Sequence, residues 1–256
     1  MTEHPNASVI PPVTQISSAD LRKALRAGWA DFRRAPLFGL FFSIFYVAGG
    51  VIIVLAFQAT GQSWWAIPFI VGFPLLAPFA AVGMYEVSRA LSSGERPKWS
   101  RVLRAAIAKG NGQIPAMAVV IMILYMVWVL VGHAIFALFM GMSALTNIST
   151  SSGSIFTTEG ITMLLVGTII GGGFAMFLYC ITVVSLPLLL HREVDFVTAM
   201  ITSFACVLRN PVPMLIWAFL IGSILLAAML PAFLGLIIAL PILGHASWHL
   251  YRKLLP

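Results

Sequence analysis

The stretch RRAPLFGLFFSIFYVAGGVIIVLAF, residues 33–57, decides the class of fold, because two arginines lead directly into a long apolar run. The run from Pro36 to Phe57 carries no charge and, as a helix, is long enough to cross a hydrocarbon core of about 30 Å. In the whole chain, 60% of residues are hydrophobic and 9% are charged, against about 45–50% and about 25% in a soluble domain. The chain is therefore expected to be an all-α membrane protein.

Further apolar runs predict a polytopic protein with six transmembrane helices: Pro36 to Phe57, Trp64 to Arg89, Pro115 to Met140, Ile161 to Leu190, Pro213 to Leu230 and Ala232 to Tyr251. The 15 Lys and Arg residues, with Arg89 counted at the end of the second run, all fall in alternate gaps: before the first run, between the second and third, between the fourth and fifth, and after the sixth. By the positive-inside rule, both termini are expected in the cytoplasm. The helices then form three hairpins.

An amphipathic helix is expected on the cytoplasmic side before each hairpin. From Leu21, apolar residues recur at helical spacing while the bases occupy the other side. This first helix is expected to lie in the plane of anionic headgroups with its apolar side on the lipid. The second is expected from Trp99 to Lys109.

The third amphipathic helix is expected between Asp195 and Arg209, and it differs from the first two. Val197, Ile201 and Leu208 make its second face apolar as well. A helix that is apolar all round is typical of a protein interior. We therefore expect this helix to be buried as a central strut.

The first and third units match each other, which predicts an internal duplication. Both amphipathic helices end in Arg-x-Pro joints, formed by Arg34 and Pro36 and by Arg209 and Pro211. At one constant offset Asp20, Ala24, Trp29 and Ala30 correspond to Asp195, Ala199, Phe204 and Ala205, and at a second offset Pro78, Tyr85, Arg89 and Leu91 correspond to Pro241, Trp248, Arg252 and Leu254. We expect a disordered cytoplasmic tail over residues 1–17 and one transmembrane domain over 18–256, with units 18–91, 97–192 and 193–256.

Within the spans, two patterns indicate structural roles. Glu86 stands three residues before Arg89 at the predicted inner boundary of the hydrocarbon, which favours an ion pair on one helix face. Gly167 and Gly171 form a small-xxx-small face, which lets another helix approach closely.

Three histidines near the inner face are candidate ligands for a metal or haem iron. His245 and His249 are four residues apart on one helix face, and His191 ends the preceding span on the same side. No cysteine or carboxylate completes a closed site with a known spacing, so no cofactor is expected. The chain also contains no nucleophile or phosphate-binding motif, and no enzyme activity is expected.

The run from Asp20 to Pro36 and the run from Gly72 to Arg89, which ends in Tyr-Glu-Val-Ser-Arg, resemble a bacterial family of predicted integral membrane proteins classed as a domain of unknown function. The resemblance extends over nearly the whole chain after the tail. Some members of that family carry a cytochrome c oxidase label. The resemblance implies a bacterial inner-membrane location and an association with respiratory enzymes, and it supplies no catalytic residues.

Two functions are compatible with these features. A haem-copper core needs about six histidines over several spans, so the chain is expected to be a non-catalytic accessory, assembly or scaffold factor rather than an oxidase. The alternative is a small transporter or channel that uses a second span broken by Pro68, Pro74 and Pro78. The expected partners are a bilayer with anionic headgroups and another membrane protein or a second copy of the chain. The net charge of +7 is topogenic, and nucleic acid is not expected as a partner.

Overall fold

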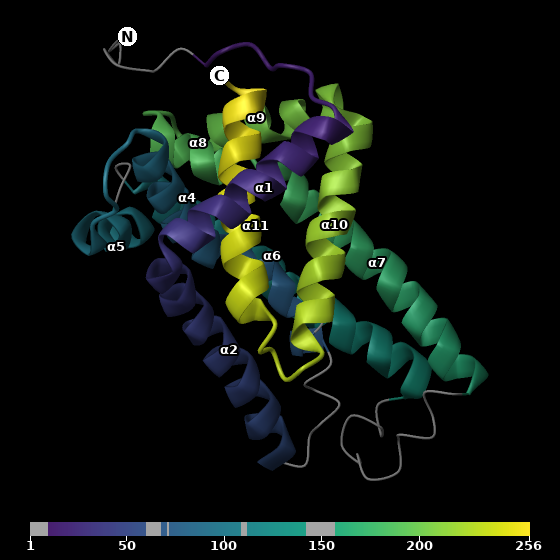
Figure 1. Cartoon of the computed structure of the whole chain (residues 1–256). Helices are drawn as coiled ribbons and strands as arrows, with labels where there is room; N and C mark the ends of the chain where they lie inside the picture. The colour runs from purple at the N-terminus through teal and green to yellow at the C-terminus, as the bar shows by residue number, and fades with distance from the viewer. Residues whose placement is uncertain (1–9, 60–67, 71, 109–111, 142–156) are drawn as a thin grey trace. The chain divides into compact units, whose positions relative to one another are not determined.

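The computed structural model describes residues 10–59, 68–70, 72–108, 112–141 and 157–256. Their regular structure is helical, as expected (Figure 1). The chain divides into two compact units. Unit 1 comprises Met1–Val47, Ala77–Val120 and Tyr179–Pro256, and unit 2 comprises Ala48–Leu76 and Ile121–Leu178.

Among the described residues, five helices are long and apolar enough to cross a membrane: Pro36–Ala59, Pro68–Ser92, Gln113–Met140, Thr158–His191 and Pro211–Met229. Each overlaps one of the predicted spans, which confirms the prediction of an all-α polytopic membrane protein. The first, third and fifth are the single helices α2 (Pro36–Ala59), α6 (Gln113–Met140) and α10 (Pro211–Met229). The predicted sixth span, Ala232 to Tyr251, is not among the five.

Helix α11 (Leu236–Leu254) occupies most of that sixth segment. It begins later than predicted, because the chain turns after α10 with positive φ angles of 50° at Ala232 and 65° at Phe233. Gly235 closes this turn against α10, where a Cβ atom would lie only 2.7 Å from the Cα of Ala228.

Helix α11 is the centre of unit 1, and 13 of its 19 residues are buried. It packs against α1 (Ser18–Arg34) and α4 (Ala77–Ser92), with α8 (Ser185–His191) and α10 also in contact. In Figure 1, α1 crosses α11 diagonally. The central strut of this unit is therefore α11.

Helix α9 (Phe196–Arg209) is not the buried strut that its sequence predicted. Its Ala199, Ser203 and Cys206 face the protein, whereas Ile201 and Leu208 are each 65% exposed. The prediction was wrong because a lipid-exposed side chain is as apolar as a buried one, so an all-round apolar pattern does not distinguish the two surroundings.

The apolar face of α1 packs on α11, and the prediction that it would lie on lipid was wrong. Leu21, Ala24 and Gly28 are buried at this contact. A Cβ atom at Gly28 would lie 2.6 Å from both the nitrogen of Ala246 and the carbonyl oxygen of Ile242. Glycine therefore permits the two helices to cross at close range.

The two Arg-x-Pro joints have the same backbone geometry. Helix α1 ends at Arg34, Ala35 follows with φ −140° and ψ 55°, and α2 begins at Pro36. Helix α9 ends at Arg209, Asn210 follows with φ −130° and ψ 51°, and α10 begins at Pro211. In both joints one non-helical residue turns the chain, and the proline then starts the next helix.

Residues 10–17 form an extended segment with defined partners, so the prediction of a disordered tail was wrong for them. The N–H of Thr14 donates to the carbonyl of Leu254 at 2.9 Å, and the N–H of Ile16 donates to Oδ1 of Asn210 at 2.8 Å. The remaining tail, residues 1–9, lies outside the described residues. Residues 10–17 therefore lie against the end of α11 and the joint before α10.

The second span is interrupted, as its prolines suggested. Residues Phe73–Leu76 form a 3-10 turn, η1, before α4 begins. In unit 2, the indole N–H of Trp128 donates to the backbone carbonyl of Pro68 at 2.9 Å. The hydroxyl of Tyr125 donates to the backbone carbonyl of Phe69 at 3.3 Å. Side chains of α6 thus satisfy carbonyls beside the interruption.

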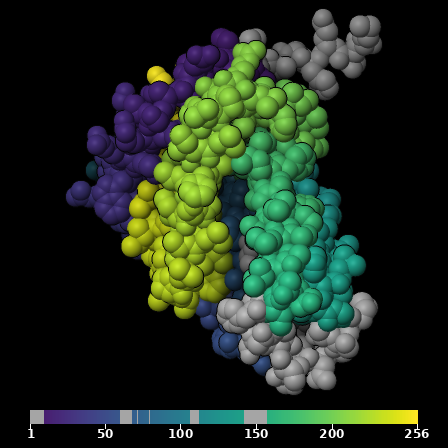
Figure 2. Space-filling view, turned by 90° about the vertical axis from the view of Figure 1, so that its right-hand side faces the viewer, coloured from purple at the N-terminus to yellow at the C-terminus, as the bar shows by residue number. Residues whose placement is uncertain are grey.

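The transmembrane helices expose apolar side chains, as lipid contact requires. Helix α10 lies at the surface of unit 1 (yellow-green in Figure 2), and its Leu215, Ile216 and Phe219 are exposed. In a soluble protein such a surface would be an aggregation hazard. In a bilayer it is solvated by acyl chains.

Candidate functional site

A buried polar network joins three helices of unit 1. Oδ2 of Asp31 in α1 accepts a hydrogen bond from Oγ of Ser88 in α4 at 2.7 Å and lies 2.8 Å from Nε2 of His249 in α11. The same Ser88 hydroxyl lies 2.8 Å from Nδ1 of His245 in α11. Asp31, Ser88 and His245 are all buried. These four residues are called the α1–α11 network below.

Close helix packing brings these residues together. Gly28 lets α1 approach α11, and Asp31 lies almost one turn further along the same face of α1. On the other side of α11, a Cβ atom at Gly244 would lie 2.9 Å from the Cβ of Met84 in α4. His245 and His249 follow Gly244 on α11, so the helix carries both imidazoles to the level of Asp31 and Ser88.

The electrostatics of the network favour a charged carboxylate. Burial alone would raise the pKa of Asp31, but hydrogen bonds from His249 and Ser88 outweigh burial and hold that pKa below its ordinary value. With the Ser88 hydroxyl donating to Asp31, Nδ1 of His245 is the donor to Ser88. The network therefore consists of complementary donors and acceptors around one buried negative charge.

The network does not have the geometry of a serine hydrolase. In a catalytic triad the histidine contacts both the serine and the acid. Here Asp31 contacts His249 and Ser88, whereas His245 contacts Ser88. Ser88 is fully buried as well. The arrangement is suited to holding α1, α4 and α11 together.

A second network surrounds Glu86 in the second half of α4. The carboxylate of Glu86 is fully buried and accepts two hydrogen bonds from Arg89, each of 2.7 Å, from Nε and Nη2. Nε of Arg101, in α5 (Trp99–Ala108), lies 4.0 Å from Oε1 of Glu86. This is the Glu86–Arg89 pair that the sequence spacing favoured, with a second arginine added from another helix.

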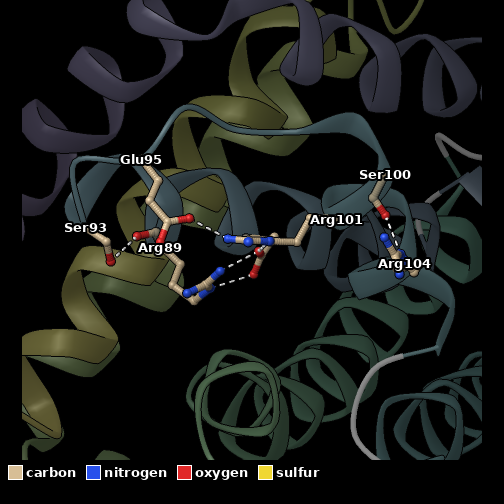
Figure 3. A network of polar contacts seen from close by, with 7 residues as sticks. Arg89, Ser93, Glu95, Ser100, Arg101 and Arg104 are labelled. Carbon is tan, nitrogen blue, oxygen red and sulfur yellow. Dashed lines mark hydrogen bonds and ion pairs between the residues drawn. The ribbon is translucent and has the colours of Figure 1, made fainter.

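Figure 3 shows how Arg101 reaches back from α5 toward the end of α4. Its guanidinium pairs with Glu95 in the connecting segment through Nη1 at 2.5 Å. Ser93 caps α4 by donating its hydroxyl to the carbonyl of Arg89 at 3.1 Å. These contacts fix α5 against α4.

The three candidate histidines separate into two groups. His245 and His249 belong to the α1–α11 network, whereas Nδ1 of His191 lies 2.8 Å from the hydroxyl of Tyr251. The His191 ring also packs near Trp248, with 5.7 Å between the ring centroids. Within the described parts of the chain, no group of three or more His, Cys, Asp or Glu residues is placed to hold a metal ion.

The two glycines of the fourth span have different surroundings. Helix α7 (Thr158–Thr182) contains both. A Cβ atom at Gly171 would lie 2.7 Å from Cη2 of Trp128, whereas at Gly167 it would meet nothing within 4 Å. Trp128 also meets Gly72, where a Cβ would lie 2.4 Å from Cδ1 of the indole. Gly171 therefore makes room for one side of the Trp128 ring, and Gly72 for the other.

Sequence reasoning missed two residues of the α1–α11 network, Asp31 and Ser88, and it also missed Asn210, which binds the segment 10–17. Asp31 had a detectable signal, because it continues the inward face of Leu21, Ala24 and Gly28 in a helix whose bases all point elsewhere. An acid on the apolar face of a basic helix indicates a buried partner. Ser88 and Asn210 carried no comparable signal.

The comparison with protein families matches a shorter part of the chain than expected, since the expected resemblance covered nearly the whole chain after the tail. Residues 66–191 match the family model DUF2189, described as a predicted integral membrane protein. The matched region contains Glu86 and Ser88 but ends before α9, α10 and α11. Searches of curated proteins and of solved structures gave no match. Across residues 66–191, the chain is thus similar to the predicted integral membrane proteins of the DUF2189 family.

Proposed function

We propose that the protein is a non-catalytic component of the bacterial inner membrane, an accessory, assembly or scaffold factor associated with a respiratory oxidase. The observation that carries the proposal is that the buried polar residues of the protein form contacts between its helices. Asp31 contacts both Ser88 and His249, which joins three helices, and the fully buried Glu86 contacts an arginine of α4 and one of α5. Such contacts supply rigidity, which a scaffold needs.

The proposed topology has six spans, with α11 as the sixth and both termini in the cytoplasm. Helix α11 is buried among other helices, so its histidines and serine need not face lipid and low hydropathy does not prevent it from crossing. The segment 10–17 contacts both Asn210 before α10 and Leu254 in α11. The two ends of the last hairpin therefore lie on one side of unit 1, and the positive-inside rule favours the cytoplasm for that side.

Single cysteines test this topology. A cysteine at Ser93, in the basic connection after α4, should be protected from an impermeant thiol reagent in intact cells. A cysteine at Glu159, in the first turn of α7, should react. Both side chains are exposed, so the opposite labelling pattern would invert the proposed orientation.

Co-purification tests the role. A tagged chain at native abundance, solubilised in mild detergent, should carry stoichiometric subunits of a respiratory oxidase. Deletion of the gene should lower the amount of assembled oxidase without lowering transcription of its subunits. A chain that purifies alone, from cells whose oxidase is unaffected by the deletion, would contradict the proposal.

The alternative proposal, a small transporter or channel, rests on the interruption of the second span. In transporters, unwound segments present free carbonyls to ions. Here the carbonyls of Pro68 and Phe69 already accept hydrogen bonds from Trp128 and Tyr125. This favours a role in helix packing for the interruption over a role in ion binding. Solute flux through the purified protein in liposomes would reverse that preference.

A further inference from the structure

Helix α1 presents a basic stripe on the side opposite α11. The side chains of Arg22, Arg26, Trp29 and Arg33 are exposed, and they follow one another at the spacing of a single helix face. The inner face of α1 is fixed by its packing on α11. The stripe is therefore a surface of defined orientation.

Helix α9 provides an internal comparison for this stripe. At the offset that relates the two helices, Arg22, Arg26, Trp29 and Arg33 correspond to Val197, Ile201, Phe204 and Leu208, which are 45%, 65%, 39% and 65% exposed. The buried faces correspond too, since Ala24, Gly28 and Asp31 match Ala199, Ser203 and Cys206. Both helices thus turn the same face outward, and only the chemistry of that face differs.

The charges on the stripe are available for an external partner. None of the ion pairs formed between described residues includes Arg22, Arg26 or Arg33. Asp20, the acid nearest to Arg22 in sequence, instead accepts hydrogen bonds from the backbone N–H and the hydroxyl of Ser17, at 2.9 Å and 2.8 Å. The guanidinium groups therefore have unused donors.

We propose that the outer face of α1 binds the headgroups of anionic phospholipids, while the equivalent face of α9 contacts acyl chains. Arginine donates bidentate hydrogen bonds to phosphate. Trp29, 46% exposed in the middle of the stripe, has the side chain that favours the boundary between headgroups and hydrocarbon. An aromatic ring among bases fits a lipid surface better than it fits a free anion. The proposal does not depend on the scaffold role.

Lipid retention tests the proposal. The full chain is reconstituted in nanodiscs of phosphatidylglycerol and phosphatidylcholine in equal amounts, extracted in mild detergent, and analysed for bound lipid by native mass spectrometry. Neutralising Arg22, Arg26 and Arg33 to Gln should lower the ratio of retained phosphatidylglycerol to phosphatidylcholine by at least about tenfold, because each base near a membrane surface contributes on the order of 1 kcal/mol. The single variant Arg26→Gln should lower it by about threefold to fivefold and serves if the triple variant does not fold.

The matched control neutralises Arg96, Lys98 and Arg104 to Gln. These three bases are also exposed and lie on the same predicted side of the membrane, but they are not on α1. The control should retain phosphatidylglycerol like the unaltered chain. If both triple variants lost phosphatidylglycerol equally, the effect would be due to net charge alone and the proposal would be overturned. Unchanged phosphatidylglycerol retention in the α1 variants would also overturn it.

A competition experiment separates lipid from free anion. Short-chain phosphatidylglycerol should displace the retained lipid, whereas inorganic phosphate at the same concentration should not. Equal displacement by phosphate would identify a soluble anion site, and displacement by a short single-stranded oligonucleotide alone would identify a nucleic-acid site. Either result would overturn the assignment to lipid.

Discussion

Oδ2 of Asp31 lies 2.8 Å from Nε2 of His249, and this contact joins the first helix of the described structure to the last. The carboxylate is buried, and Ser88 supplies its second hydrogen bond. A buried charge is stable only when its partners are in place. The pair is therefore expected to govern whether α1 stays on α11.

Replacement of Asp31 by Ala should destabilise the protein, because it leaves the donors of Ser88 and His249 without their acceptor. The expected loss is about 2–3 kcal/mol, measured as a lower midpoint of thermal unfolding in detergent. In a double-mutant cycle with His249→Ala, the two effects should couple by on the order of 1 kcal/mol or more. Glu193→Ala, which removes an exposed acid, is the control, and a loss as large as that of Asp31→Ala would contradict the assignment.

The same network predicts a pH dependence. The pKa of Asp31 is lower in the folded protein than its ordinary value, so its contribution to stability is present above the unfolded pKa, about 3.9. That contribution is lost as the pH falls from about 5 through the folded pKa. The unfolding midpoints of the parent protein and of Asp31→Asn should therefore converge below about pH 4. A gap that widened on acidification would contradict this sign.

Asn210 should control the order of the N-terminal segment. Its amide accepts from Ile16 and donates to the carbonyls of Thr14 and Cys206, the latter two at 3.2 Å. Asn210→Ala should free residues 10–17 and make them more susceptible to protease, which mass spectrometry of limited digests would detect. Asn210→Asp keeps an acceptor for Ile16 but loses the donor, so an intermediate result is expected. Identical digestion of all three proteins would show that the segment is held by other contacts.

Helical periodicity and proline positions predicted most of the helices, but not the break between α7 and α8 or the start of α11. The amphipathic helices before α2, α6 and α10 and the joints at Pro36 and Pro211 follow from local sequence, because each depends on residues within a few turns. The importance of α11 does not follow from local sequence. Its His245 and His249 lower its hydropathy, and only tertiary packing shows that they face Asp31 and Ser88 rather than lipid.

The assignment of inward and outward faces was less predictable from sequence. The sequence pattern predicted that Val197, Ile201 and Leu208 are buried, but their side chains are exposed. Gly167 and Gly171 read as equivalent, and only Gly171 faces a bulky side chain. In both cases the deciding fact is what lies opposite the residue, which a single sequence does not contain. The Glu86–Arg89 spacing was informative because both partners are on one helix.

The glycines of α7 allow a matched test of packing in unit 2. Gly171→Ala should lower stability by about 1–3 kcal/mol, since the new methyl group would lie 2.7 Å from Trp128 and the indole is confined on its other side by Gly72. Gly172→Ala should be neutral or slightly stabilising, because nothing lies within 4 Å of its Cβ position. Both substitutions raise helix propensity by the same amount, so the difference between the unfolding midpoints of the two variants reports the packing effect alone. Equal effects of the two substitutions would place Trp128 elsewhere.

Glu86 separates a structural role from a transport mechanism. Its carboxylate is buried against Arg89, with Arg101 nearby, so Glu86→Gln should be tolerated fairly well because it keeps the shape and part of the hydrogen bonding. Glu86→Leu should reduce the amount of folded protein, since Arg89 loses its acceptors at a cost of about 1–3 kcal/mol. Abundance in membranes and the unfolding midpoint in detergent measure both effects. If Glu86 instead exchanged protons during a transport cycle, the Gln variant would be abundant and stable yet inactive in liposome flux, because an amide keeps the fold but cannot titrate. That outcome would favour the transporter over the scaffold.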